Sequence, residues 1–152
     1  MTPPYLKVCC IQSRTELELA VRLGASALGF VGAMPSGPGP IADARIAELV
    51  PLVPPPVAAF LLSSETTASG LAAHVERAGR PQVLQIVTHV DPAIYPALRR
   101  ALPWTRLVQV IHVEGRDQAM ALADTYGGLA DALLLDSGRP SAATPTLGGT
   151  GQ

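Results

Sequence analysis

Six short apolar runs, rich in Val, Ile and Leu, alternate along the chain with segments of helical spacing, and this alternation constrains the fold more than any other feature. The runs lack a clean polar alternation, so each is expected to be a strand buried on both faces. They read LKVCCI, ALGFV, PVAAFLL, QVLQIV, RLVQVIHV and DALLLD. Strands that alternate with helices predict an α/β fold with parallel pairing and right-handed crossovers.

The segments between these runs have the spacing of amphipathic helices. In TELELAVRLGA, Leu17, Ala20 and Val21 lie on one helical face, and Gly24 is suited to end the helix. Pro96 falls inside DPAIYPALRRAL and should kink that helix or delay its start. The remaining helical segments read ADARIAELVPLV, ETTASGLAAHVERAG and GRDQAMALADTYGG.

Repeats spaced by roughly 20–30 residues fit either an open doubly wound sheet or part of a (β/α)8 barrel of the TIM type. No G-x-G-x-x-G motif follows the first run, which weakens the case for a dinucleotide-binding sheet. No low-complexity linker interrupts the chain. Residues 1–152 are therefore expected to form one domain.

Composition and charge exclude several classes of protein. The chain is 48% hydrophobic and 15% charged, which is typical of a globular protein. Eleven Lys and Arg residues, a net charge of −1 and 4% aromatic residues argue against nucleic acid as a partner. No apolar stretch reaches the length of about 18 residues that indicates a membrane span, and the N-terminus lacks the pattern of a signal peptide.

The two cysteines, Cys9 and Cys10, are adjacent and close the first apolar run. Adjacent cysteines cannot reach relaxed disulfide geometry, so they fit a reducing compartment, and a cytoplasmic protein is expected. Small thiols often fill a core, but one of them could instead lie at the mouth of a pocket and do chemistry. The residues alone leave both alternatives open.

Several of these runs resemble motifs of one family. KVCCI resembles the K-[IV]-C-G-[IL] opening of phosphoribosylanthranilate isomerase, a (β/α)8-barrel enzyme of tryptophan biosynthesis. LGASALGFV is similar to its second strand, QVLQIV to its fourth, VQVIHV to its fifth, and DALLLDS with LGGTG to its sixth strand and glycine loop. The resemblance implies a TIM barrel of which about six β/α units are present. We therefore expect either a fragment or a barrel completed by another chain, with an oligomer as one way to cover the opening.

The resemblance implies an Amadori rearrangement that converts a phosphorylated sugar amine from the aldose to the ketose form. An acid protonates the furanose ring oxygen and a base removes the C2′ proton, so neither a metal nor an organic cofactor is expected. Cys9 matches the family's general base and Asp136 its general acid, each at the carboxyl end of a predicted strand. Cys10 replaces a family glycine and, facing the other way, is expected to pack in the core, whereas Lys7 shares the side of Cys9 and would favour its thiolate.

The resemblance also suggests residues that bind substrate, with two departures from the family pattern. The loop MPSGPGPI lacks the arginine that holds the anthranilate carboxylate in the family, and QIVT lacks the family's histidine, for which His89 could substitute. The glycines near the end could offer backbone N–H groups to a phosphate. The predicted substrate-binding residues are Lys7, Ser36, Gln85, His112, Gly148, Gly149 and Gly151.

Each candidate also has an interpretation without function. Asp136 could be a turn residue, His112 a buried neutral histidine, the glycine-rich end a flexible tail, and Arg45 a solvated helical residue. At the level of the protein, three alternatives stay open. They are the isomerase itself, a divergent paralogue acting on another phosphosugar amine, and a non-catalytic partial barrel that serves as a binding module.

Overall fold

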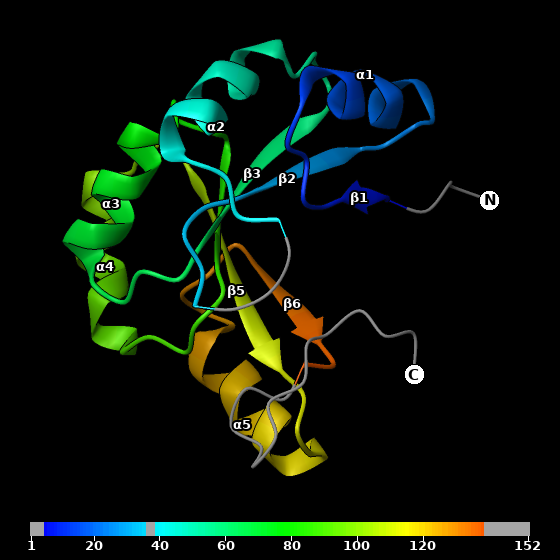
Figure 1. Ribbon diagram of the computed structural model, residues 1–152. Helices are drawn as coiled ribbons and strands as arrows, with labels where there is room; N and C mark the ends of the chain where they lie inside the picture. The colour runs from blue at the N-terminus through cyan, green and yellow to red at the C-terminus, as the bar shows by residue number, and fades with distance from the viewer. Residues whose placement is uncertain (1–4, 36–38, 139–152) are drawn as a thin grey trace.

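The computed structural model describes residues 5–35 and 39–138 (Figure 1). Its strands form one six-stranded parallel sheet in the order β1-β2-β3-β4-β5-β6. The strands are β1 (Lys7–Val8), β2 (Ala27–Val31), β3 (Ala58–Ser63), β4 (Val83–Ile86), β5 (Arg106–His112) and β6 (Ala132–Asp136). This sequential order confirms the barrel-type prediction, because a doubly wound sheet would reverse direction about its first strand.

Helices connect successive strands and line the outer side of the curled sheet (Figure 1). The bounds match the predicted segments to within a few residues. The α-helices are α1 (Arg14–Arg22), α2 (Asp43–Leu49), α3 (Ala68–Arg77), α4 (Tyr95–Ala101) and α5 (Arg116–Tyr126), with short 3-10 helices η1 (Val50–Leu52) and η2 (Pro92–Ile94).

Local sequence signals account for where the helices begin and end. Ser13 and Glu16 form a capping box that starts α1, and Gly24 follows that helix with a φ of 91°. Pro96 lies in the first turn of α4, and η2 precedes it, so the helix starts late, as the proline predicts.

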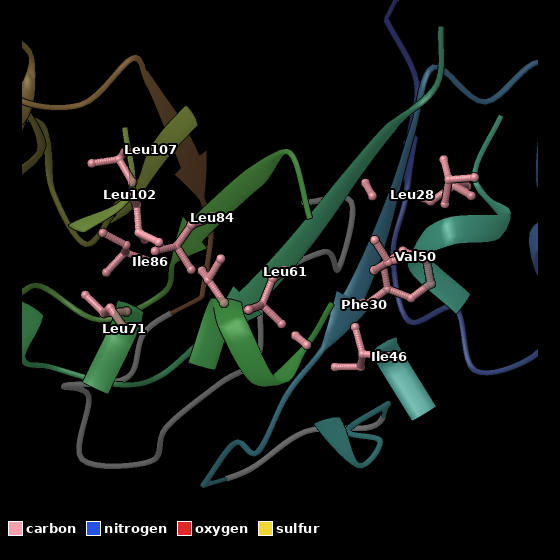
Figure 2. Close-up of a cluster of buried hydrophobic side chains, with 14 of the residues drawn as sticks. Leu28, Phe30, Ile46, Val50, Leu61, Leu71, Leu84, Ile86, Leu102 and Leu107 are labelled. Atoms are coloured by element: carbon pink, nitrogen blue, oxygen red, sulfur yellow. The ribbon is translucent and has the colours of Figure 1, made fainter. Parts of the chain in front are cut away.

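The hydrophobic core lies between the sheet and the helices. Leu28, Leu61 and Leu84 point from three neighbouring strands toward this core, where Ile46 of α2 and Leu71 of α3 meet them (Figure 2). All five of these side chains are at most 1% exposed. Because side chains alternate along a strand, the residues directly before and after Leu28, Leu61 and Leu84 in their strands point to the opposite, concave side of the sheet.

The two edge strands are β1 and β6. The register pairs Lys7 with Ala27 at one edge and His112 with Asp136 at the other. Between residues 5 and 138, leaving out 36–38, β1 pairs only with β2 and β6 only with β5, so the described sheet is open. None of the described helices is long and apolar enough to cross a membrane.

Candidate active site

Five of the predicted site residues lie at or near the carboxyl ends of strands or on the concave face of the sheet. Lys7, Gln85, His112 and Asp136 share this face by register and alternation, and Cys9 directly follows β1. Ser36, Gly148, Gly149 and Gly151 lie outside the described residues.

Two contacts hold the Lys7 side chain on the concave face of the sheet. Its Nζ donates a hydrogen bond to Oε1 of Gln85, three strands away, and lies 4.9 Å from the centroid of the Phe60 ring. Gln85 is only 5% exposed, so it supplies a fixed acceptor. Phe60 was not singled out in the sequence, although its place in β3 puts it on the same face as Gln85.

Cys9 is exposed and lies against Gly29 of β2. A Cβ placed on Gly29 would lie 2.7 Å from Sγ of Cys9, closer than real Cβ contacts allow, and 3.2 Å from its Cα, which is a tight contact. Gly29 therefore makes the space that the Cys9 thiol occupies. The glycine inside ALGFV was a signal for this contact, because glycine within a strand often marks a close approach.

Cys10 does not pack in the core, and that prediction is wrong. The residue is exposed, and its side chain lies near Gly39 of the loop between β2 and α2. The reason is that β1 ends at Val8, so strand alternation does not extend to residue 10, whose φ is 62°. This left-handed conformation favours glycine, which is the residue that the related family has at this point.

The charge of Lys7 acts on the Cys10 thiol. Burial and the neighbouring Cys9 raise the pKa of the Cys10 thiol, and Lys7 opposes them by lowering it. The net effect raises the pKa of Cys10, so this thiol holds its proton more firmly than an ordinary cysteine.

Asp136 and His112 form a pair at the end of β6 and β5. Nδ1 of His112 lies 3.3 Å from Oδ2 of Asp136, and Nε2 lies 3.0 Å from the carbonyl oxygen of Val87. The side chains of His112 and Asp136 are 17% and 29% exposed, so the pair is shielded but reachable. Gln118 of α5 donates to the His112 carbonyl oxygen at 3.1 Å and fixes the end of β5.

His89 is a second titratable neighbour of His112, beside Asp136. The two ring centroids are 5.5 Å apart, and Nε2 of His89 lies 3.5 Å from the backbone nitrogen of His112. Burial and the positive charge of His112 lower the pKa of His89, which Glu114 partly opposes. His89 is therefore a neutral ring beside the pair.

Arg45 does not take the place of the missing arginine. It lies on α2, where its Nη1 is 2.7 Å from Oε2 of Glu48 and its side chain is 44% exposed. The prediction of a solvated helical arginine is confirmed. Among residues 5–35 and 39–138, no three His, Cys, Asp or Glu side chains are grouped so that they could hold a metal ion.

A Ser-His-Asp set on the other side of the sheet was missed by sequence reasoning. Oγ of Ser63 lies 2.7 Å from Nδ1 of His74, and Nε2 of His74 lies 3.2 Å from Oδ1 of Asp43. Ser63 is completely buried and His74 is 3% exposed, so no substrate can reach this serine. The set links β3, α3 and α2, and it is structural.

The chain is similar to known proteins in sequence and in fold. No family model matches the chain. The chain is 30% identical over 148 residues to the N-(5'-phosphoribosyl)anthranilate isomerase of Synechococcus sp. (strain JA-2-3B'a(2-13)), covering 97% of this chain and 60% of that protein. It is 33% identical over 147 residues to the protein of the same name from Natronomonas pharaonis, covering 96% of this chain and 64% of that protein.

A solved structure gives the same result for the fold. The phosphoribosyl anthranilate isomerase from Thermus thermophilus matches with a TM-score of 0.73 and 27% identity, covering 91% of this chain and 65% of that chain. This chain thus spans somewhat less than two thirds of the length of each of these relatives. In sequence and in fold, the chain is similar to phosphoribosylanthranilate isomerases over that part of their length.

Proposed function

We propose that the protein isomerises N-(5′-phosphoribosyl)anthranilate in tryptophan biosynthesis. The observation that carries the proposal is the position of Cys9 and Asp136. They match the family's base and acid, they follow or end parallel strands at the carboxyl edge of the sheet, and the Cys9 thiol is exposed there. In barrels of this type the active site lies at that edge.

The proposed reaction needs one proton donor and one proton acceptor on the concave face. Asp136 donates a proton to the furanose ring oxygen, and the ring opens to a Schiff base. The Cys9 thiolate then removes the C2′ proton, and the resulting enolamine tautomerises to the ketone. This chemistry is general acid–base catalysis, which typically contributes 10²–10⁴-fold to a rate.

The remaining residues of this face support the two reacting groups. Lys7, fixed by Gln85 and the Phe60 ring, supplies a positive charge on the concave face. Ser36 and the backbone N–H groups of Gly148, Gly149 and Gly151 stay predicted contacts to the substrate, the glycines to its phosphate.

A second candidate function is the isomerisation of a different phosphosugar amine. The observation that favours it is the loop MPSGPGPI, which has no arginine, together with the commitment of Arg45 to Glu48. Loss of a charge-assisted contact to the anthranilate carboxylate should cost about 1.5–3 kcal/mol of binding. A substrate without that carboxylate would not incur this loss.

Complementation separates these candidates. The complete gene is expressed in a tryptophan auxotroph that lacks the isomerase, beside a Cys9→Ala version. Growth that depends on Cys9 supports the proposed function. No growth, together with turnover of another aminosugar phosphate by the purified protein, supports the second candidate. No turnover of any phosphosugar amine would leave the partial barrel as a binding module and overturn both.

We further propose that the protein works in the cytoplasm without a metal or organic cofactor. Its adjacent reduced cysteines suit a reducing compartment, and the acid–base chemistry requires only side chains. The open edges at β1 and β6 call for cover, and further strands or a partner subunit would supply it.

A further inference from the structure

We infer that His112 and Asp136 hold one proton between them, and that this pair, rather than a lone carboxyl group, is the acid of the proposed isomerase. The inference rests on the proposed function and assigns His112 a different role from the anion binding expected from the sequence. The observation behind it is the contact of 3.3 Å between Nδ1 of His112 and Oδ2 of Asp136.

The second ring nitrogen fixes the tautomer of His112. Nε2 lies 3.0 Å from the carbonyl oxygen of Val87, which can only accept a hydrogen bond, so Nε2 must carry a hydrogen. A neutral His112 therefore has its lone pair on Nδ1, the ring nitrogen that lies 3.3 Å from Oδ2 of Asp136. Nδ1 is buried and forms no regular hydrogen bond among the described residues, which leaves the carboxylate as its close polar neighbour.

This geometry holds a proton. Without one, a bare Nδ1 and a carboxylate oxygen would face each other as two acceptors. With one, the pair is either an imidazolium beside a carboxylate or a neutral imidazole beside a carboxylic acid, and each arrangement makes a favourable contact. The proton therefore belongs to the pair rather than to either side chain.

The groups around the pair do not supply a competing proton. His89, 5.5 Å from His112 between ring centroids, has its pKa lowered by burial and by His112. Glu114 follows β5, and the ring centroid of Tyr126 of α5 lies 6.4 Å from that of His89, with the pKa of Tyr126 raised by burial. At neutral pH both His89 and Tyr126 are uncharged, and Asp136 is the acidic group in contact with the His112 ring.

The pair solves a problem in the proposed reaction. An isolated aspartate loses its proton at a pH of about 4 and would be an ineffective acid at neutral pH, whereas a shared proton is retained to higher pH. In the acid step the proton leaves the pair for the furanose ring oxygen as the ring C–O bond breaks. The pair is then left as a carboxylate and a neutral imidazole, and it takes a proton from solvent to reset.

The test compares pH profiles of the full-length protein with His112→Asn, Asp136→Asn and a control, His74→Asn, on the opposite face. For His112→Asn we expect kcat near pH 7.5 to be about 100-fold below that of the wild type, with KM nearly unchanged, and the ratio of the two kcat values to recover toward pH 5. The control should lower activity, if at all, by the same factor at every pH. A loss for His112→Asn that is equal at every pH, or a rise in KM alone, would overturn the inference.

A second measurement does not depend on the activity, so it separates failure of the pair from failure of the proposed function. Nitrogen NMR follows the His112 ring of the full-length protein through a pH titration, with and without Asp136→Asn. The shared proton predicts that Asp136→Asn moves the loss of the His112 ring proton to lower pH. An unchanged titration would show that no proton is shared, whatever reaction the enzyme catalyses.

Discussion

At the scale of single residues, the glycine beside Cys9 and the backbone conformation of Cys10 explain where the two thiols lie. Cys9 occupies space that exists because residue 29 is glycine, and Cys10 has a left-handed backbone that glycine would adopt more easily. The sequence predicts that Cys9 faces the concave side, and its Sγ lies against Gly29 of β2. It could not predict where Cys10 lies, because a two-residue strand ends before alternation reaches that position.

Gly29→Ala should displace the Cys9 thiol while leaving the fold intact. The new Cβ would lie 2.7 Å from Sγ, so the thiol would rotate away, and 3.2 Å from the Cys9 Cα, so the backbone there would also shift slightly. A misplacement of about 1 Å in a reacting group can cost about 100-fold in rate. The measurement is kcat together with the melting temperature, and Gly128→Ala, with nothing within 4 Å of its Cβ, is the control. Full activity in Gly29→Ala would show that Cys9 does not need this position.

Cys10→Gly should keep or raise stability, in contrast to Cys10→Ala. A left-handed conformation costs a residue with a Cβ about 1–2 kcal/mol, and glycine removes this cost. Two effects oppose the gain: glycine raises the conformational entropy of the unfolded chain, and the contact of the Cys10 side chain with Gly39 is lost. We expect a gain of up to about 1 kcal/mol, or roughly 2–4 °C. Cys10→Ala keeps the strain and should show no gain. Thermal unfolding of the two variants checks this, and a large loss for Cys10→Gly would contradict the account.

At the scale of elements, hydrogen bonds of polar side chains fix the positions of helices relative to strands. Asp131 precedes β6, and its carboxylate accepts hydrogen bonds from Arg99 of α4 at 2.6 Å and from the backbone nitrogen of Leu107 at 2.7 Å. Strand and helix positions followed from apolar periodicity and capping residues. These cross-element contacts did not, since the partners are 24 to 32 residues apart and nothing in local sequence marks them.

Asp131→Asn should destabilise the protein by about 1–2 kcal/mol near neutral pH, because Arg99 loses its charged partner. Burial raises the pKa of Asp131, but the hydrogen bonds from Leu107 and Arg99 outweigh it and hold that pKa below the usual 3.8. A pKa lowered by folding stabilises the protein above the unfolded value, and this contribution is lost as pH falls through the folded value.

The difference in unfolding free energy between wild type and Asp131→Asn should therefore be full near pH 7 and shrink as the pH falls below the usual value of 3.8 and through the lowered pKa of Asp131. Urea denaturation at neutral and at acidic pH measures it. A difference that stays the same in acid would mean that the carboxylate charge is not what Arg99 and Leu107 stabilise.

At the scale of the whole molecule, the open sheet leaves a concave face, and the two side chains proposed to react, Cys9 and Asp136, lie at its carboxyl edge. Six parallel strands in sequential order form this face, and the strand motifs from KVCCI to DALLLDS predicted these strands and their order. The His112–Asp136 contact was not predicted, because the register that sets the two side by side is a property of the assembled sheet. The substrate-binding residues beyond the described chain stay predictions.

The central claim is that Cys9 and Asp136 are the base and acid of an isomerase. The most direct measurement is the rate at which the purified full-length protein converts N-(5′-phosphoribosyl)anthranilate, with Cys9→Ala, Asp136→Asn and Cys10→Ala assayed beside it. The account predicts conversion by the wild type, a loss of at least about 10²-fold in kcat for the first two variants with unchanged folding, and near wild-type turnover for Cys10→Ala. Retained turnover in Cys9→Ala with loss in Cys10→Ala would contradict it.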